Sequence, residues 1–153
     1  MNDSNSNNPD GNVIFSGTKE VAENLKFNEA GLQEWFGDSI SSAGKILKIA
    51  QFKGGQSNPT YKITTEKQQF VLRRKPPGIL LPSAHAVDRE YKVMTALQQT
   101  EVPVPKTYGL CEDEDVIGTP FFVMDFLDGN IYWDLLLGDK SPAERSDIYA
   151  SKN

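Results

Sequence analysis

The alternation of apolar and polar residues predicts a run of three β-strands in the first half of the chain. Apolar residues in segment 46–52 end at Gly54-Gly55, resume at 61–63, and return in 70–74 after a charged turn. Short strands joined by tight connections pair antiparallel with their sequence neighbours. We therefore predict a three-stranded antiparallel meander.

A helical period follows these strands. Residues 83–99 carry apolar side chains at helical spacing and are followed by two prolines, which ends the predicted main helix. Segments 107–111 and 120–126 are predicted to be two further strands, and 28–36 a short helix packed on the sheet. The predicted fold class is therefore α+β, with a five-stranded antiparallel sheet and one main helix.

Local composition divides the chain into three parts. Residues 1–17 are polar and of low complexity, and we expect a disordered tail there. Residues 18–127 hold the predicted sheet and helices and should form one compact lobe. Residues 128–153 are expected to be a hinge and the start of a helical lobe, in which Ser141-Pro-Ala-Glu144 is a capping box with proline at the first helical position. That helix is expected to reach the end of the chain before it is complete.

Charge and composition exclude several classes of function. Sixteen Lys and Arg against 21 Asp and Glu give a net charge of -5, which disfavours binding to nucleic acid. The longest apolar runs, 121–124 and 135–137, are far shorter than the roughly 20 residues that span a membrane. The first 12 residues lack the features of a secretory signal, so a cytoplasmic location is expected. With a single cysteine, Cys111, and a single histidine, His85, neither an internal disulfide nor a Cys/His zinc site is expected.

Glu90 is the most informative position in the main helix. At 100° per residue it lies in the same stripe as the apolar residues Val87, Met94 and Leu97. An unpaired buried charge costs several kcal/mol, so a cationic partner is expected from the sheet beneath. Strand alternation makes Arg73 that candidate, since it faces away from Phe70, Leu72 and Arg74. From the helix alone, a Glu90 that simply reaches the surface is equally compatible.

A glycine-containing loop joins the first two predicted strands. Gly54-Gly55-Gln56-Ser57-Asn58 can direct backbone N–H groups at a phosphate, because glycine has no Cβ to block close approach. Taken alone, the loop is also compatible with a plain hairpin turn. Neither a P-loop nor a Rossmann glycine motif is present in the sequence.

The order of these features resembles a known family. The glycine loop, Phe70-Val-Leu-Arg73, Arg89-Glu90 and Phe122-Val-Met-Asp-Phe-Leu-Asp-Gly129 look like the N-terminal lobe of aminoglycoside phosphotransferases and choline kinases, which have a protein-kinase-like fold. The segments 73–78, 81–85, 118–120 and 133–134 are most similar to the kinase-like domain fused in front of certain acyl-CoA dehydrogenases.

The resemblance implies an ATP site and assigns residues to it. Gly54, Gly55, Gln56, Ser57 and Asn58 would cover the phosphates. Arg73 would stand where kinases usually place a lysine that holds the α and β phosphates, and Glu90 would hold Arg73. The remaining residues, Met124 as gatekeeper, Val71 against the base, and the backbone of Asp125 and Leu127 at its polar edge, would bind adenine.

The resemblance also implies which parts are missing. In the family, a catalytic aspartate in a His-Gly-Asp type loop and an acidic motif that holds Mg²⁺ lie in the C-terminal lobe, and neither motif occurs in these 153 residues. No catalytic or metal-binding residue is therefore assigned. We expect His85 to be a surface or helix-start residue, the acidic run 112–115 to be a solvated turn, and Cys111 to be a small strand residue.

The function implied is transfer of the γ-phosphate of ATP to a hydroxyl of a small substrate, with a hydroxyacyl thioester among the acceptors that the dehydrogenase-linked relatives suggest. The chain alone should be inactive. A non-catalytic nucleotide-binding or interaction module, or an inactive truncated product, is the alternative. Coding sequence beyond residue 153 with a His-Gly-Asp motif would favour the enzyme.

Overall fold

A computed structural model describes residues 17–54, 57–129, 136–138 and 140–151. The chain divides into two compact units, and the larger one comprises residues 17–128. The described residues from 129 onward belong to the other unit. The disordered tail predicted for residues 1–17 falls, apart from Gly17, outside the described residues.

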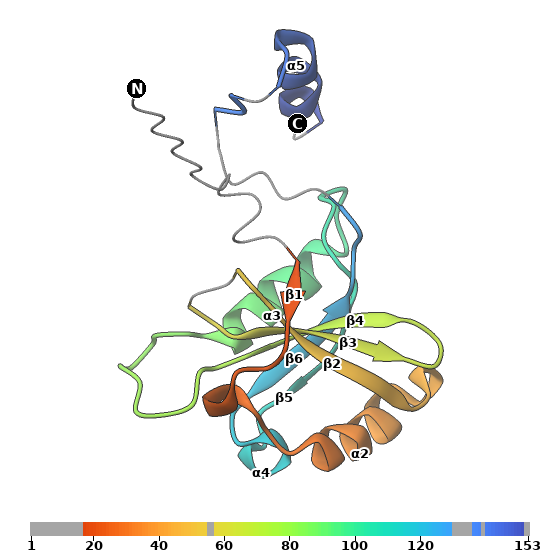
Figure 1. The fold of residues 1–153 in the computed structure, drawn as a ribbon, viewed down its shortest axis with the longest axis vertical. Coiled ribbons are helices and arrows are strands. Elements are labelled where there is room, and N and C mark those ends of the chain that lie inside the picture. The colour runs from red at the N-terminus through yellow and green to blue at the C-terminus, as the bar shows by residue number, and fades with distance from the viewer. Residues whose placement is uncertain (1–16, 55–56, 130–135, 139, 152–153) are drawn as a thin grey trace, which may run out of the picture. The chain divides into compact units, whose positions relative to one another are not determined.

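The larger unit is an α+β lobe built on an antiparallel sheet with the strand order β1-β2-β3-β4-β6-β5 (Figure 1). Its strands are β1 Thr18–Lys19, β2 Ile46–Phe52, β3 Thr60–Thr65, β4 Gln69–Arg74, β5 Thr107–Cys111 and β6 Phe121–Asp125. All five predicted strands are present. The sixth, β1, pairs with the end of β2 through Thr18 opposite Phe52, and its two residues are too few to show an alternating pattern.

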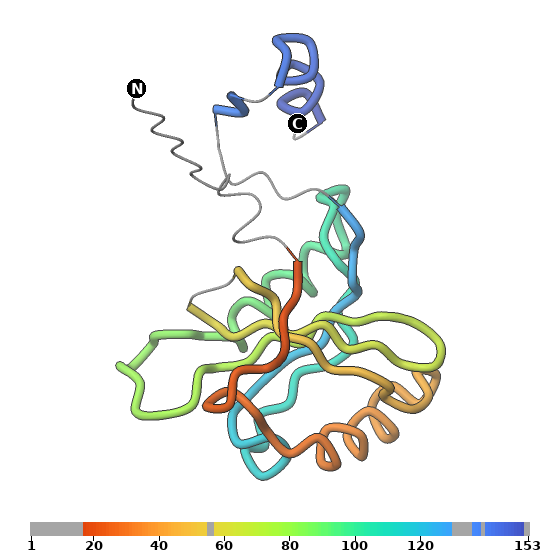
Figure 2. The backbone as a smooth tube through the Cα atoms, in the orientation of Figure 1, coloured from red at the N-terminus to blue at the C-terminus, as the bar shows by residue number. Residues whose placement is uncertain are grey.

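Two helices cover opposite faces of the sheet (Figures 1 and 2). Helix α2, Glu29–Ser39, buries Leu32 and Phe36 in the core formed with β3, β4 and β6. Helix α3, Val87–Leu97, lies on the other face, where Tyr91 contacts Phe122 with ring centroids 6.0 Å apart. The hydrophobic core therefore lies on the α2 side, and the α3 side is left to build a site.

Two helix predictions need correction. The main helix was expected from residue 83, but α3 begins at Val87 because Ser83 and His85 adopt left-handed backbone conformations, with φ of 68° and 58°. The acidic run expected to be a turn continues into a short helix, α4, Glu114–Ile117. Asp113 caps the start of α4, and Gly118, with φ of 95°, ends it.

Three shorter helical elements complete the described structure. They are the 3-10 helices η1 Glu23–Leu25 and η2 Ser41–Ala43, and α5 Pro142–Ala150 in the smaller unit. The predicted capping box of α5 is confirmed, since the Ser141 side chain accepts from the Glu144 N–H and the Glu144 side chain accepts from the Ser141 N–H. None of the described helices has both the length and the apolar character needed to cross a membrane.

Two glycines of α2 offer a matched test of its packing. A Cβ on Gly31 would collide with the backbone oxygen of Val116 and lie 2.7 Å from the Asn28 amide, whereas a Cβ on Gly37 meets nothing within 4 Å. Gly31→Ala is expected to lower the free energy of unfolding by about 1–3 kcal/mol, because the helix must move away from α4. Gly37→Ala should instead raise it by up to about 1 kcal/mol through helix propensity. Urea denaturation measures both, and equal effects of the two variants would contradict this packing.

Candidate nucleotide-phosphate site

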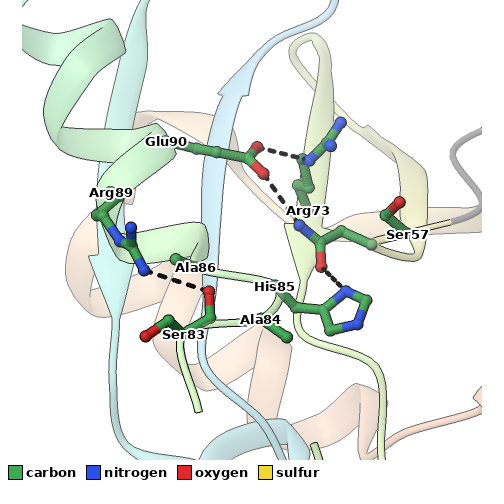
Figure 3. Close-up of a pocket in the computed structure, with 9 residues that line it drawn as sticks. Ser57, Arg73, Ser83, Ala84, His85, Ala86, Arg89 and Glu90 are labelled. Atoms are coloured by element: carbon green, nitrogen blue, oxygen red, sulfur yellow. Dashed lines mark hydrogen bonds and ion pairs between the residues drawn. The ribbon is translucent and has the colours of Figure 1, made fainter. Parts of the chain in front are cut away.

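Strand β4 aims Arg73 at helix α3. Its alternation places Val71 and Arg73 on the α3 face, and Phe70, Leu72 and Arg74, all of them buried, on the α2 face. Arg73 Nε lies 2.7 Å from Glu90 Oε2, which confirms the ion pair expected from the sequence (Figure 3). The two side chains are 30% and 37% exposed, so the pair lies at the edge of a solvent-accessible site.

The contact between these groups is ionic rather than a well-directed hydrogen bond. Arg73 Nε is buried and has no hydrogen bond of good geometry, even though the Glu90 oxygen is at ion-pair distance. Glu90 therefore holds the guanidinium by charge. Because a guanidinium carries five N–H donors, the pair leaves donors for an additional anion.

A pocket of about 490 Å³ opens beside this ion pair. Its walls come from the end of the glycine loop, β4, the turn before α3 and the first turn of α3. The lining residues are Ser57, Asn58, Arg73, Ser83, Ala84, His85, Ala86, Arg89 and Glu90. Two arginines face one carboxylate, so the lining carries an excess positive charge before His85 is counted. Such a site favours an anionic ligand.

Asn58 joins the glycine loop to the ion pair. Its side-chain Nδ2 donates to Glu90 Oε1 at 3.0 Å, and its Oδ1 is 3.1 Å from His85 Nδ1. Asn58 is only 2% exposed, so these bonds satisfy a polar group that would be costly to bury alone. A chain of contacts therefore runs from His85 through Asn58 and Glu90 to Arg73.

Sequence reasoning missed the turn that precedes α3. His85, expected at the surface or at a helix start, is half-buried and bonded to Asn58. Arg89 Nη2 donates to the Ser83 carbonyl at 3.2 Å, which ties the turn to the helix. The left-handed backbone of Ser83 and His85 brings this turn into the pocket, and neither periodicity nor a motif signals that conformation.

The glycine loop is described only in part. Gly55 and Gln56 lie outside the described residues, whereas Gly54 is half-buried and Ser57 is exposed at the pocket. Asn58 is held by a further contact, because its carbonyl accepts a hydrogen bond from Thr60 Oγ1 at 3.0 Å.

Val71 and Met124, two of the residues predicted to bind adenine, lie on the same face of the sheet. Cross-strand pairing puts Ala50 opposite Lys62, Lys62 opposite Val71, and Val71 opposite Met124, which forms one row. Lys62 is an unexpected cation in this row, with its Nζ 4.1 Å from the centre of the Phe126 ring.

Asp125 and Leu127 follow this row at the end of β6. The Asp125 carboxylate accepts a hydrogen bond from the Tyr108 hydroxyl, and Leu127 is 62% exposed. Burial, followed by the bond to Asp125, raises the pKa of the Tyr108 phenol. The carboxylate of Asp125 is thus engaged within the lobe, and its backbone carbonyl is the group left for the predicted role.

Two further features considered in the sequence are Cys111 and the acidic run 112–115. Cys111 is buried at the end of β5, and burial raises the pKa of its thiol, which lowers its reactivity at neutral pH. The acidic residues 112–115 are exposed. Across the described residues there is no group of three or more His, Cys, Asp or Glu side chains that could hold a metal ion.

Comparison with known proteins identifies the class of this lobe. The model of the phosphotransferase enzyme family matches residues 48–151, and the chain belongs to this family. A crystal structure assigned as an aminoglycoside phosphotransferase, from Ralstonia eutropha JMP134, superposes with a TM-score of 0.67 at 44% identity, covering 82% of this chain and 35% of that one. The lobe therefore has the kinase-like fold.

The curated relatives are much longer proteins. Human acyl-CoA dehydrogenase family member 11 is 44% identical over 143 residues, which cover 89% of this chain and 18% of that protein. Mouse acyl-CoA dehydrogenase family member 10 is 50% identical over 107 residues, or 70% of this chain and 10% of that protein. The chain thus spans less than a fifth of these relatives, and it is similar to the kinase-like domain that they carry.

Proposed function

We propose that this chain is the nucleotide-binding lobe of an ATP-dependent phosphotransferase that phosphorylates a hydroxyl of a small molecule. The observation that carries the proposal is the Arg73–Glu90 ion pair, set at the edge of an anion-favouring pocket beside the glycine loop. Glu90 fixes the guanidinium, and Arg73 binds the α and β phosphates of ATP through its remaining donors. Ser57 adds a hydroxyl donor from the loop.

The reaction is a transfer of the γ-phosphoryl group. The acceptor oxygen attacks the γ-phosphorus, the bond to the β–γ bridging oxygen breaks, and ADP leaves while the hydroxyl proton passes to a base. This lobe contributes positioning and charge neutralisation on the donor side. The base, the ligands for Mg²⁺ and most of the acceptor site belong to the remainder of the family domain.

The nucleobase is placed by the row that contains Val71 and Met124, with the backbone of Asp125 and Leu127 at its polar edge. The acceptor we propose is a small alcohol, and the dehydrogenase-linked relatives favour a hydroxyacyl thioester. The proposed site of action is the cytoplasm.

Titration of the chain with ATP, followed by NMR, tests this function. ATP and ADP should shift signals around Arg73 and Ser57 with a Kd above about 10 µM, because only one wall of the cleft is present. Adenosine should bind at least about tenfold more weakly, since the phosphates supply the charged contacts. Lys67→Ala removes a cation in the β3–β4 turn and should leave the titration unchanged.

Two results would contradict the proposal. The first is the absence of any ATP-induced shift. The second is sub-micromolar affinity, which would mean that the site lies elsewhere in the chain. Equal affinity for ATP and adenosine would show that Arg73 does not bind the phosphates, although the chain would still bind the adenine base.

A further inference from the structure

A series of contacts runs from His85 through Asn58 to Glu90. Whether each group can donate or accept a hydrogen bond determines how the next group must be oriented. An ionised carboxylate only accepts hydrogen bonds, so Glu90 requires the amide nitrogen of Asn58. The Asn58 oxygen must then face His85, and this oxygen also only accepts. His85 must therefore carry its proton on Nδ1.

The backbone around His85 is strained in a way that serves this contact. Ser83 and His85 both have positive φ, 68° and 58°, within three residues, and each costs roughly 1–2 kcal/mol for a residue other than glycine. The turn is nevertheless tied down at two points, by Arg89 on the Ser83 carbonyl and by Asn58 on the His85 ring. Strain held by specific contacts beside a pocket points to a functional conformation.

We propose that His85, in its Nδ1–H tautomer, is a positioning residue of the phosphate site. It fixes the Asn58 amide, Asn58 fixes Glu90, and Glu90 holds Arg73 against the phosphates. This inference rests on the nucleotide-binding function proposed above. It adds that the turn before α3, and not only the glycine loop and the ion pair, sets the geometry of the phosphate clamp.

The tautomer can be read directly, because His85 is the only histidine in the chain. Imidazole nitrogen NMR on the neutral ring is expected to show the proton on Nδ1 and a bare Nε2. Asn58→Ala should shift the ring toward a mixture of tautomers. A wild-type ring protonated on Nε2 would overturn the proposal whatever the binding data show.

Substitutions of His85 test the effect on the clamp. His85→Ala should raise the Kd for ATP about fivefold, the loss expected for one net hydrogen bond. His85→Asn places an amide donor where Nδ1 lies and tolerates the left-handed backbone, so it should recover affinity to within about twofold of the wild type. His85→Gln places its donor at the position of Nε2 and should not recover it. Val93→Ala, an exposed change on α3 and outside the pocket, is the control.

A double-variant cycle separates positioning from general destabilisation. In an Asn58→Ala background, His85→Ala should cause no further loss of ATP affinity, because the link between the two residues is already broken. Two results would overturn the role of His85 and leave the nucleotide function standing. One is that the losses of ATP affinity in the two single variants add in the double variant. The other is that His85→Ala leaves the Kd unchanged while the wild type binds ATP. A wild type that binds no ATP would overturn the nucleotide function as well, so the two failures are distinguished in the wild-type arm.

Discussion

Arg73→Ala should lower kcat/KM for ATP about 100-fold in an enzyme that joins this chain to the remainder of the phosphotransferase domain. The variant removes the charged contacts to phosphate and leaves the Glu90 carboxylate unpaired beside the bound anion, and losses of this kind amount to roughly 2–3 kcal/mol. ADP release across a panel of alcohols, including hydroxyacyl thioesters, measures the effect. The chain alone should release no ADP with any acceptor, since the proposed role of this lobe is limited to holding the phosphate donor.

Lys67→Ala is the matched control for this measurement, because it removes a positive charge that is exposed and outside the pocket. It should leave kcat/KM within about twofold of the wild type. Substrate-dependent ADP release by the chain alone, lost in Arg73→Ala, would show that catalysis resides in this lobe. An extended enzyme that tolerates Arg73→Ala would remove the proposed phosphate clamp.

Phe36→Ala is expected to lower the free energy of unfolding by about 3–5 kcal/mol. Phe36 is fully buried, and its ring lies edge-on to Phe70 at 5.4 Å between centroids, so its removal leaves a cavity between α2 and the sheet. Urea denaturation measures the change. Leu47→Ala, at a side chain that is 62% exposed, should change stability by less than about 0.5 kcal/mol. A loss below about 1 kcal/mol for Phe36→Ala would contradict the core.

Local sequence patterns were sufficient to predict most of the lobe. The two-residue period of β4 correctly separated Arg73 from Phe70 and Leu72, and the helical period of α3 placed Glu90 on the face turned to the sheet. Both predictions depend only on regular backbone geometry. Together, the two periods were enough to predict the ion pair between strand and helix.

The features that were missed depend on irregular backbone or on partners distant in sequence. Strand β1 is defined by its pairing with Gln51 and Phe52 rather than by its own two residues. The contact between His85 and Asn58 joins residues 27 positions apart and requires a left-handed residue that is not glycine. Short-range patterns carry no information on either feature. For α4, by contrast, Asp113 and Gly118 were visible capping signals.

The neighbouring arginines of β4 have opposite surroundings. Arg73 lines the pocket. Arg74 is only 2% exposed and donates to Thr119 Oγ1 at 2.8 Å, and burial lowers the pKa of its guanidinium. Slipping the register of this whole strand by one residue would bring Arg74 to the pocket face and keep a cation there, but it would also turn Phe70 and Leu72 out of the core. The two arginines therefore provide no redundancy. Insertions or deletions that slip β4 in this way should be eliminated by misfolding before any loss of nucleotide binding could be selected against.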